Sequence, residues 1–129
     1  MGIQFISPTS VAPPRGHYTP GVVHGGIVYV AGQLPFDKEG QIQLGSIEDQ
    51  MVWCMYNIEQ VLLASQSDLY HILKINIYVH DISLWPRING VYAKIMGDHK
   101  PARTVVPCLL LHYGSEIEID CIAAIKNTP

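Results

Sequence analysis

Apolar positions recur with different periods along the chain, and each period predicts either a strand or a helix. Two β-branched runs between residues 22 and 31 flank Gly25-Gly26, which predicts a β-hairpin closed by a tight turn. From Ser46 to about Ala64 apolar residues recur every three or four positions, which predicts an amphipathic helix with Ser46 as its N-cap. Strict alternation from residue 73 to 79 predicts a strand.

In the C-terminal half the pattern again predicts first a helix and then strands. A second helix is predicted from Leu84 to Met96, because Pro86 suits a first turn and Gly97 suits a helix end. Two strands are then expected, one over residues 103–111 and one over residues 116–125.

The remaining segments are less regular. Residues 7–21 are rich in proline and glycine and predict an extended segment with several turns, and a short strand is expected around 41–44, after a turn at 37–40. The order of strands and helices favours an α+β fold, in which two helices pack on one face of a mixed sheet.

The strand expected over residues 103–111 is apolar on both of its faces. A sheet with one solvated face alternates apolar and polar residues. Because the helices cover only one side, we expect the other side to be buried against neighbouring subunits; too few strands are predicted for the alternative, a second sheet. The charged fraction of 15% is low against the roughly 25% typical of domains, which also favours an oligomer.

Composition narrows the class of protein. The chain has 129 residues, 48% of them hydrophobic, and we expect one domain over residues 1–129. No apolar run approaches the roughly 18 residues of a membrane-spanning helix, and the first ten residues lack the pattern of a secretory signal. The net charge is −3 without a basic cluster, and the cysteines number three. We therefore expect a cytoplasmic protein with neither a membrane nor a nucleic-acid partner.

Three carboxylates share one face of the strand expected over residues 116–125. Period-two geometry places Glu116, Glu118 and Asp120 on the same side. Glu118 lies between two isoleucines and is the best suited to point into a cleft, where it would hold a water or carry a proton. For Glu116 and Asp120 a solvated position at the end of an edge strand is the favoured alternative.

Arg103 is the second candidate. It follows Lys100-Pro101-Ala102 at the start of a strand, and a guanidinium on a rigid element suits bidentate capture of a carboxylate. The alternative is an ordinary surface salt bridge. If the last two strands form an antiparallel pair, Arg103 and Glu118 lie far apart within one chain and meet more easily across a subunit interface. The six histidines lack metal-site spacing, so we expect no metal.

Five segments together resemble the Rid family of reactive-intermediate deaminases, also called YjgF-like proteins. They are RGHYTPGV (15–22), VYVAGQLP (28–35), INGVY (88–92), HKPART (99–104) and EIEIDCIA (116–123). The resemblance covers nearly the whole chain. It implies a chorismate-mutase-like subunit and a homotrimer with clefts between subunits.

The resemblance also implies an activity, the hydrolysis of 2-imino acids to 2-oxo acids and ammonia without a cofactor. In a 2-iminobutanoate/2-iminopropanoate deaminase of this kind, Arg103 binds the substrate carboxylate and Glu118 positions the attacking water. Tyr18 and Asn89 match further substrate-binding positions, and backbone groups of Ala31 and Gly32 line the pocket, in a loop that matches the family's Ser-Gly-Gln.

Departures from the family pattern leave other functions open. Ala31 stands where many members have serine, and Val105 where many have cysteine, while Leu111-His112-Tyr113-Gly114 replaces the usual turn before the last strand. This turn favours a larger substrate, such as a 2-aminomuconate-like one, or is a changed hairpin without catalytic consequence. A different class of function also fits: a non-catalytic trimer that binds small carboxylate metabolites.

Overall fold

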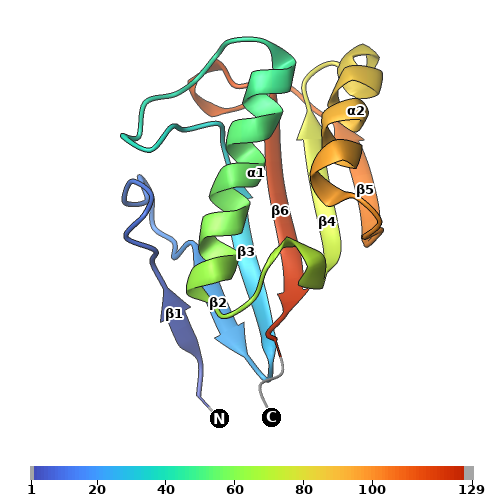
Figure 1. Cartoon of the computed structure of the whole chain (residues 1–129). Coiled ribbons are helices and arrows are strands. Elements are labelled where there is room, and N and C mark those ends of the chain that lie inside the picture. The colour runs from blue at the N-terminus through green and yellow to red at the C-terminus, as the bar shows by residue number, and fades with distance from the viewer. Residues whose placement is uncertain (1, 127–129) are drawn as a thin grey trace.

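The computed structural model describes residues 2–126 and shows a mixed sheet of six strands in the order β1-β2-β3-β6-β4-β5. The strands are β1 Gln4–Ile6, β2 Gly21–His24, β3 Ile27–Gln33, β4 Ile72–Val79, β5 Ala102–Pro107 and β6 Ile117–Ala124. Helices α1 (Ile47–Ala64) and α2 (Trp85–Met96) both lie on the same face of the sheet, α1 over β3 and β6 and α2 over β4 and β5 (Figure 1). The α+β class and the placement of the helices are confirmed.

The predicted hairpin is present as β2 and β3. Gly25 (φ 59°) and Gly26 (φ 79°) both have positive φ, as a type I′ turn requires. The two strands therefore pair in regular register up to the turn, with His24 opposite Ile27. Strand β1, which the sequence did not predict, pairs antiparallel with β2 and forms the edge of the sheet.

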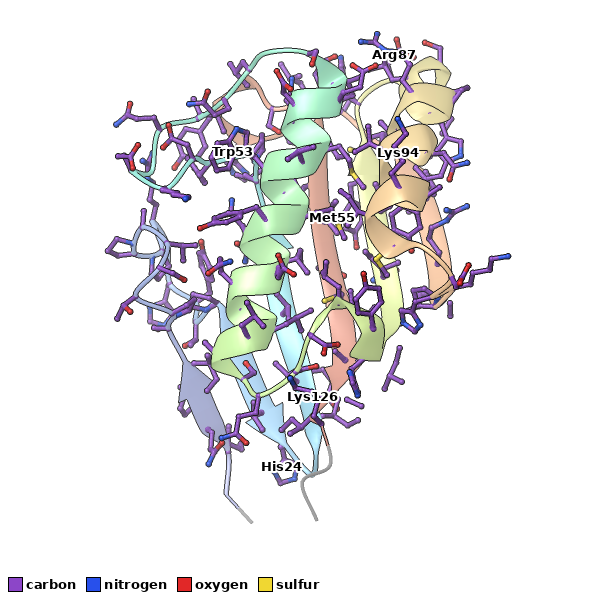
Figure 2. All side chains as sticks on the ribbon, viewed as in Figure 1. His24, Trp53, Met55, Arg87, Lys94 and Lys126 are labelled. Carbon is purple, nitrogen blue, oxygen red and sulfur yellow. The ribbon has the colours of Figure 1, made fainter. Side chains whose placement is uncertain are left out.

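Both helices begin and end close to where the sequence predicted. The Ser46 hydroxyl accepts a hydrogen bond from the Asp49 amide at 3.1 Å, which caps α1. Pro86 lies in the first turn of α2, and Gly97 ends that helix with φ 60°. Figure 2 shows Arg87 near the start of α2, where its guanidinium donates to Glu48 of α1 at 2.7 and 2.8 Å.

The core lies between the helices and the sheet. Along β6 buried and half-buried residues alternate without a break, because this strand is central and only one of its faces lies under α1. Ile117, Ile119 and Cys121 point into the core, and Ile75 and Ile77 continue the same layer on β4. Residues at the alternate positions, including Glu118 and Asp120, lie on the face that carries no helix.

The C-terminal strands pair differently from the arrangement considered above. Strand β5 ends at Pro107 instead of residue 111, and it pairs in parallel with β4, not with β6. The reason is topological: α2 crosses over between β4 and β5, and a strand–helix–strand connection returns the chain in the same direction. The apolar residues after Pro107 leave the sheet, and Leu109 is 87% exposed.

The strand expected around residues 41–44 does not form. A single bridge joins Phe36 to Ile42, and the Asp37 carboxylate accepts hydrogen bonds from the amides of Glu39 and Gln41, both at 2.9 Å. The Asp37 side chain thus stabilises a turn. Because it accepts hydrogen bonds from these backbone amides, they are not available for strand pairing.

Candidate functional site

Glu118 lies in a cavity of about 310 Å³ on the face of the sheet that carries no helix. Strands β3 and β6 supply the floor, and the segments around residues 15–18, 34–36 and 112–113 supply the walls. The lining residues are Arg15, Gly16, Tyr18, Ala31, Gly32, Leu34, Phe36, His112, Tyr113 and Glu118. The structure thus brings together four of the six predicted site residues: Tyr18, Ala31, Gly32 and Glu118.

The Glu118 carboxylate is packed directly against the backbone of Gly32. A Cβ on Gly32 would lie 2.3 Å from Glu118 Oε2, so any larger residue here would force the Glu118 side chain to move. Burial raises the pKa of the Glu118 carboxyl above its ordinary 4.5, the charge of His112 lowers it in part, and Asp120 raises it. A carboxylate whose pKa is raised in this way is a stronger base toward a bound water than an exposed one.

A bulge in β3 shapes the floor of this cavity. Val30 pairs with Cys121 and Gln33 with Ile119, so Ala31 and Gly32 together face one residue of β6, Asp120. The Ala31 amide donates to Pro20 O at 2.9 Å, outside the β3–β6 ladder. Bulges redirect side chains next to binding sites, and this one lets the backbone of Gly32 approach Glu118 closely.

Arg103 lies at a different cavity, of about 370 Å³, between α2 and the start of β5. Its guanidinium stands over the rings of Trp85 (4.8 Å) and Tyr92 (5.1 Å) and donates to Asn89 Oδ1 at 3.1 Å. The side chain is exposed, but three side chains of α2 hold its guanidinium in place. The salt-bridge alternative does not apply among residues 2–126, where Arg103 forms no ion pair.

The two cavities lie on opposite faces of the sheet. Arg103 pairs across the ladder with Ile75, which is fully buried under the helices, whereas Glu118 pairs with Tyr78 on the other face. Two strands of one sheet cannot bring these side chains together within a single chain. The six predicted residues therefore lie in two separate groups: Asn89 and Arg103 line one cavity, and the other four line the second.

The other two carboxylates of the predicted acidic face have protein partners. Glu116 precedes β6 and exchanges hydrogen bonds with Gln50 of α1: its amide donates at 3.0 Å, and its carboxylate accepts at 3.2 Å. Asp120 accepts from Asn76 Nδ2 at 2.7 Å. The expectation of a solvated end of an edge strand is wrong for both, because β6 is central and its neighbours supply donors.

The structure adds two side chains that sequence reasoning missed, Arg15 and Phe36. The Arg15 guanidinium lies over the Phe36 ring at 4.6 Å and the Tyr113 ring at 5.5 Å. These residues come from three distant segments, and no spacing in the sequence connects them. The unusual residues His112 and Tyr113 were noted in the sequence, and both line the cavity.

Residues 2–126 hold no group of three or more His, Cys, Asp or Glu side chains arranged to bind a metal ion. Within the same residues, neither helix combines the length and apolar character needed to cross a bilayer.

Comparison with known proteins supplies a family context. The family model described as endoribonuclease L-PSP matches residues 9–125. The mitochondrial protein Mmf1 of Saccharomyces cerevisiae is 33% identical over 129 residues, which cover 98% of this chain and 89% of that protein. A RutC family protein of Pyrococcus horikoshii is 37% identical over 117 residues, covering 89% of this chain and 93% of that protein.

Solved structures show the same fold. The crystal structure of RidA from an Antarctic Psychrobacter superposes with a TM-score of 0.90 at 29% identity, over 95% of this chain and 99% of that one. The structure of Escherichia coli TdcF with bound serine gives a TM-score of 0.89 at 25% identity, again over 95% and 99% of the two chains.

Proposed function

Because the chain belongs to the Rid family, also called YjgF-like proteins, we propose that it hydrolyses reactive 2-imino acids to 2-oxo acids and ammonia. The observation that carries this proposal is the half-buried Glu118 carboxylate, held against Gly32 in a cavity of metabolite size. A carboxylate in such a cavity is of little use for binding an anion alone, since it would repel the ligand.

The chemistry needs an oriented substrate and a water molecule. Arg103, fixed by Asn89 and by the rings of α2, offers a bidentate donor for the substrate carboxylate. The serine bound to E. coli TdcF, an amino acid with the same α-carboxylate, supports a ligand of this class.

Glu118 acts as the base. It takes a proton from water while the water oxygen bonds to the carbon of the protonated imine, which gives a neutral carbinolamine. Glu118 then returns this proton to the nitrogen. The carbon–nitrogen bond breaks, the hydroxyl group gives its proton to the departing ammonia, and a 2-oxo acid and ammonium leave. Atoms and charge balance without a cofactor, and the contribution of the protein is orientation and proton transfer.

A complete site then requires two chains, because Arg103 and Glu118 lie on opposite faces of one sheet. We propose a homotrimer, in which Arg103 of one subunit faces Glu118 of the next. The face without helices supports assembly, since it exposes Phe5 and Tyr29. Leu109 and Leu110, which follow β5, are exposed apolar residues as well.

The cellular location remains part of the proposal. All three cysteines are free thiols, which fits a reducing compartment such as the cytoplasm. The yeast relative Mmf1 is named as a mitochondrial protein, and that name applies to the relative alone.

The decisive experiment measures ammonia release from 2-iminobutanoate generated in situ by a threonine dehydratase. The wild-type protein should accelerate release, Arg103→Ala should abolish the acceleration, and Glu118→Gln should reduce turnover while carboxylate binding persists. Arg87→Gln and Glu48→Gln are matched controls, because this pair lies outside both cavities.

Two outcomes would overturn the proposal. Full activity in Arg103→Ala would remove the proposed carboxylate site. A wild-type protein that binds 2-oxo acids but never accelerates hydrolysis would instead establish the non-catalytic, metabolite-binding alternative.

A further inference from the structure

The guanidinium of Arg15 lines the Glu118 cavity, and nothing in the proposed reaction uses it. Arg15 comes from the segment before β2 and borders the cavity together with Glu118, Tyr18 and His112. It lies on the same side of the sheet as Glu118 within one chain, in contrast to Arg103, which borders the other cavity.

Arg15 is held in place by groups that leave its charge unbalanced. The rings of Phe36 (4.6 Å) and Tyr113 (5.5 Å) pack against the guanidinium, and one N–H donates to the carbonyl oxygen of Gly40. Across residues 2–126 no carboxylate lies within 4.0 Å of Arg15. A guanidinium has five N–H donors, so donors remain available on a group that is already oriented.

The turn that contains Tyr113 forms the part of the cavity wall next to Arg15. Tyr113 adopts φ 60° and ψ 21°, a left-handed conformation that costs a non-glycine residue free energy and persists only where surrounding contacts fix it. Here the contacts are the edge-to-face packing of its ring with Phe36 (5.5 Å) and the Arg15 guanidinium. The same turn places His112 in the wall beside Glu118.

We propose that Arg15, with His112, forms a subsite for a second anionic group, so that the preferred substrates are dicarboxylic 2-imino acids. This inference rests on the proposed function. Arg103 of the neighbouring subunit would bind the α-carboxylate, and Arg15 would bind the distal carboxylate through its free donors. The cavity of about 310 Å³ lies at the lower end of the roughly 300–1,000 Å³ range of ligand sites, which fits a metabolite of this size.

A purely structural role for Arg15 is the competing explanation. Its bond to Gly40 and its packing on Phe36 join the N-terminal segment to the 36–42 turn, and losing them would loosen both. A structural loss would affect every substrate alike, whereas loss of a subsite would change the ratio between two substrates. The test therefore uses that ratio.

The experiment compares hydrolysis of 2-iminoglutarate and 2-iminobutanoate, each generated in situ by an amino-acid oxidase or dehydratase. The wild-type protein should favour the dicarboxylic imine in kcat/KM. Arg15→Gln should lower kcat/KM for that imine by about tenfold or more, the effect of one charge-assisted hydrogen bond, and leave the monocarboxylic value nearly unchanged. Arg15→Lys, which keeps the charge, should recover part of the preference.

Equilibrium binding separates this inference from the proposed function. Titration calorimetry with the stable products 2-oxoglutarate and 2-oxobutanoate should show the same preference and its loss in Arg15→Gln, even if turnover is absent. An equal response of both ligands to Arg15→Gln would overturn the subsite. Loss of all 2-oxobutanoate binding in Arg15→Gln would overturn it as well, because Arg15 would then bind the α-carboxylate. Activity that survives in Arg103→Ala contradicts the proposed function alone.

Discussion

The carboxylate of Glu118 lies on the backbone of Gly32, with no room for a side chain between them: a Cβ on Gly32 would lie 2.3 Å from Oε2 and 3.0 Å from Cδ. The β3 bulge makes this contact possible, since it turns Gly32 toward the neighbouring strand. The position of the proposed base therefore depends on a glycine one strand away.

Gly32→Ala should displace the Glu118 side chain and lower imine hydrolysis strongly. Because the methyl group meets the end of a flexible side chain, the fold should persist with only a small change in melting temperature. Gly90→Ala is the matched control: a Cβ there meets nothing within 4 Å, and alanine in place of a helical glycine should stabilise α2 by up to about 1 kcal/mol. Unchanged kcat/KM in Gly32→Ala would show that the position of Glu118 does not limit the reaction.

The pH dependence of hydrolysis should report the ionisation of Glu118. Burial raises the pKa of this carboxyl above 4.5, and the base must be ionised to accept a proton from water. As pH falls, kcat/KM should therefore decline with an apparent pKa above 4.5. A midpoint at or below 4.5 would contradict the assignment.

The raised pKa of Glu118 also makes the stability of the fold depend on pH, in the direction opposite to activity. A carboxyl whose folded-state pKa is raised binds its proton more tightly in the folded protein than in the unfolded chain. The contribution of Glu118 to stability is therefore fully present below about 4.5 and declines as pH rises to the folded-state value. Comparison of the pH–stability curves of the wild type and Glu118→Gln measures this term, because glutamine removes it.

Local sequence patterns determined most elements of the fold but not the pairing of the strands. The hairpin at Gly25-Gly26 and the cap at Ser46 were predictable, because each depends on neighbours within a few residues. The partner of β5 depends on the crossover through α2, and strand β1 is three residues long, too short for a clear period.

The candidate site shows the same division. Alternation along β6 was sufficient to place Glu118 opposite the core, and a motif placed Tyr18 near it. Arg15 was missed because its partners, Phe36 and Tyr113, come from turns far away in the chain. Such a cluster exists only after three loops have folded over the sheet, and no periodicity records it.

The N-cap of α1 offers a test of the fold that is independent of function. Ser46→Ala removes the acceptor for the Asp49 amide and should lower the free energy of unfolding by about 1 kcal/mol. Chemical denaturation measures the change. Ser10→Ala, at an exposed serine in the N-terminal segment, should have almost no effect, and an equal loss in both variants would argue against the cap.

Complementation between two impaired variants tests whether the site is shared between subunits of the proposed homotrimer. Arg103→Ala lacks the carboxylate-binding group and should be inactive, and Glu118→Gln lacks the base and should keep only a low residual turnover. In a trimer that contains both variants, some sites combine the intact Arg103 of one chain with the intact Glu118 of the next. If the variants are unfolded and refolded together in equal amounts, random assembly makes about a quarter of the sites complete, so activity should return to roughly that level.

Mixing the two variants without subunit exchange is the control, and it should restore no activity. Mixed trimers, verified by mass spectrometry, that remain inactive would show that Arg103 and Glu118 do not act on the same substrate molecule. The opposite faces on which these residues lie would then mark two separate sites.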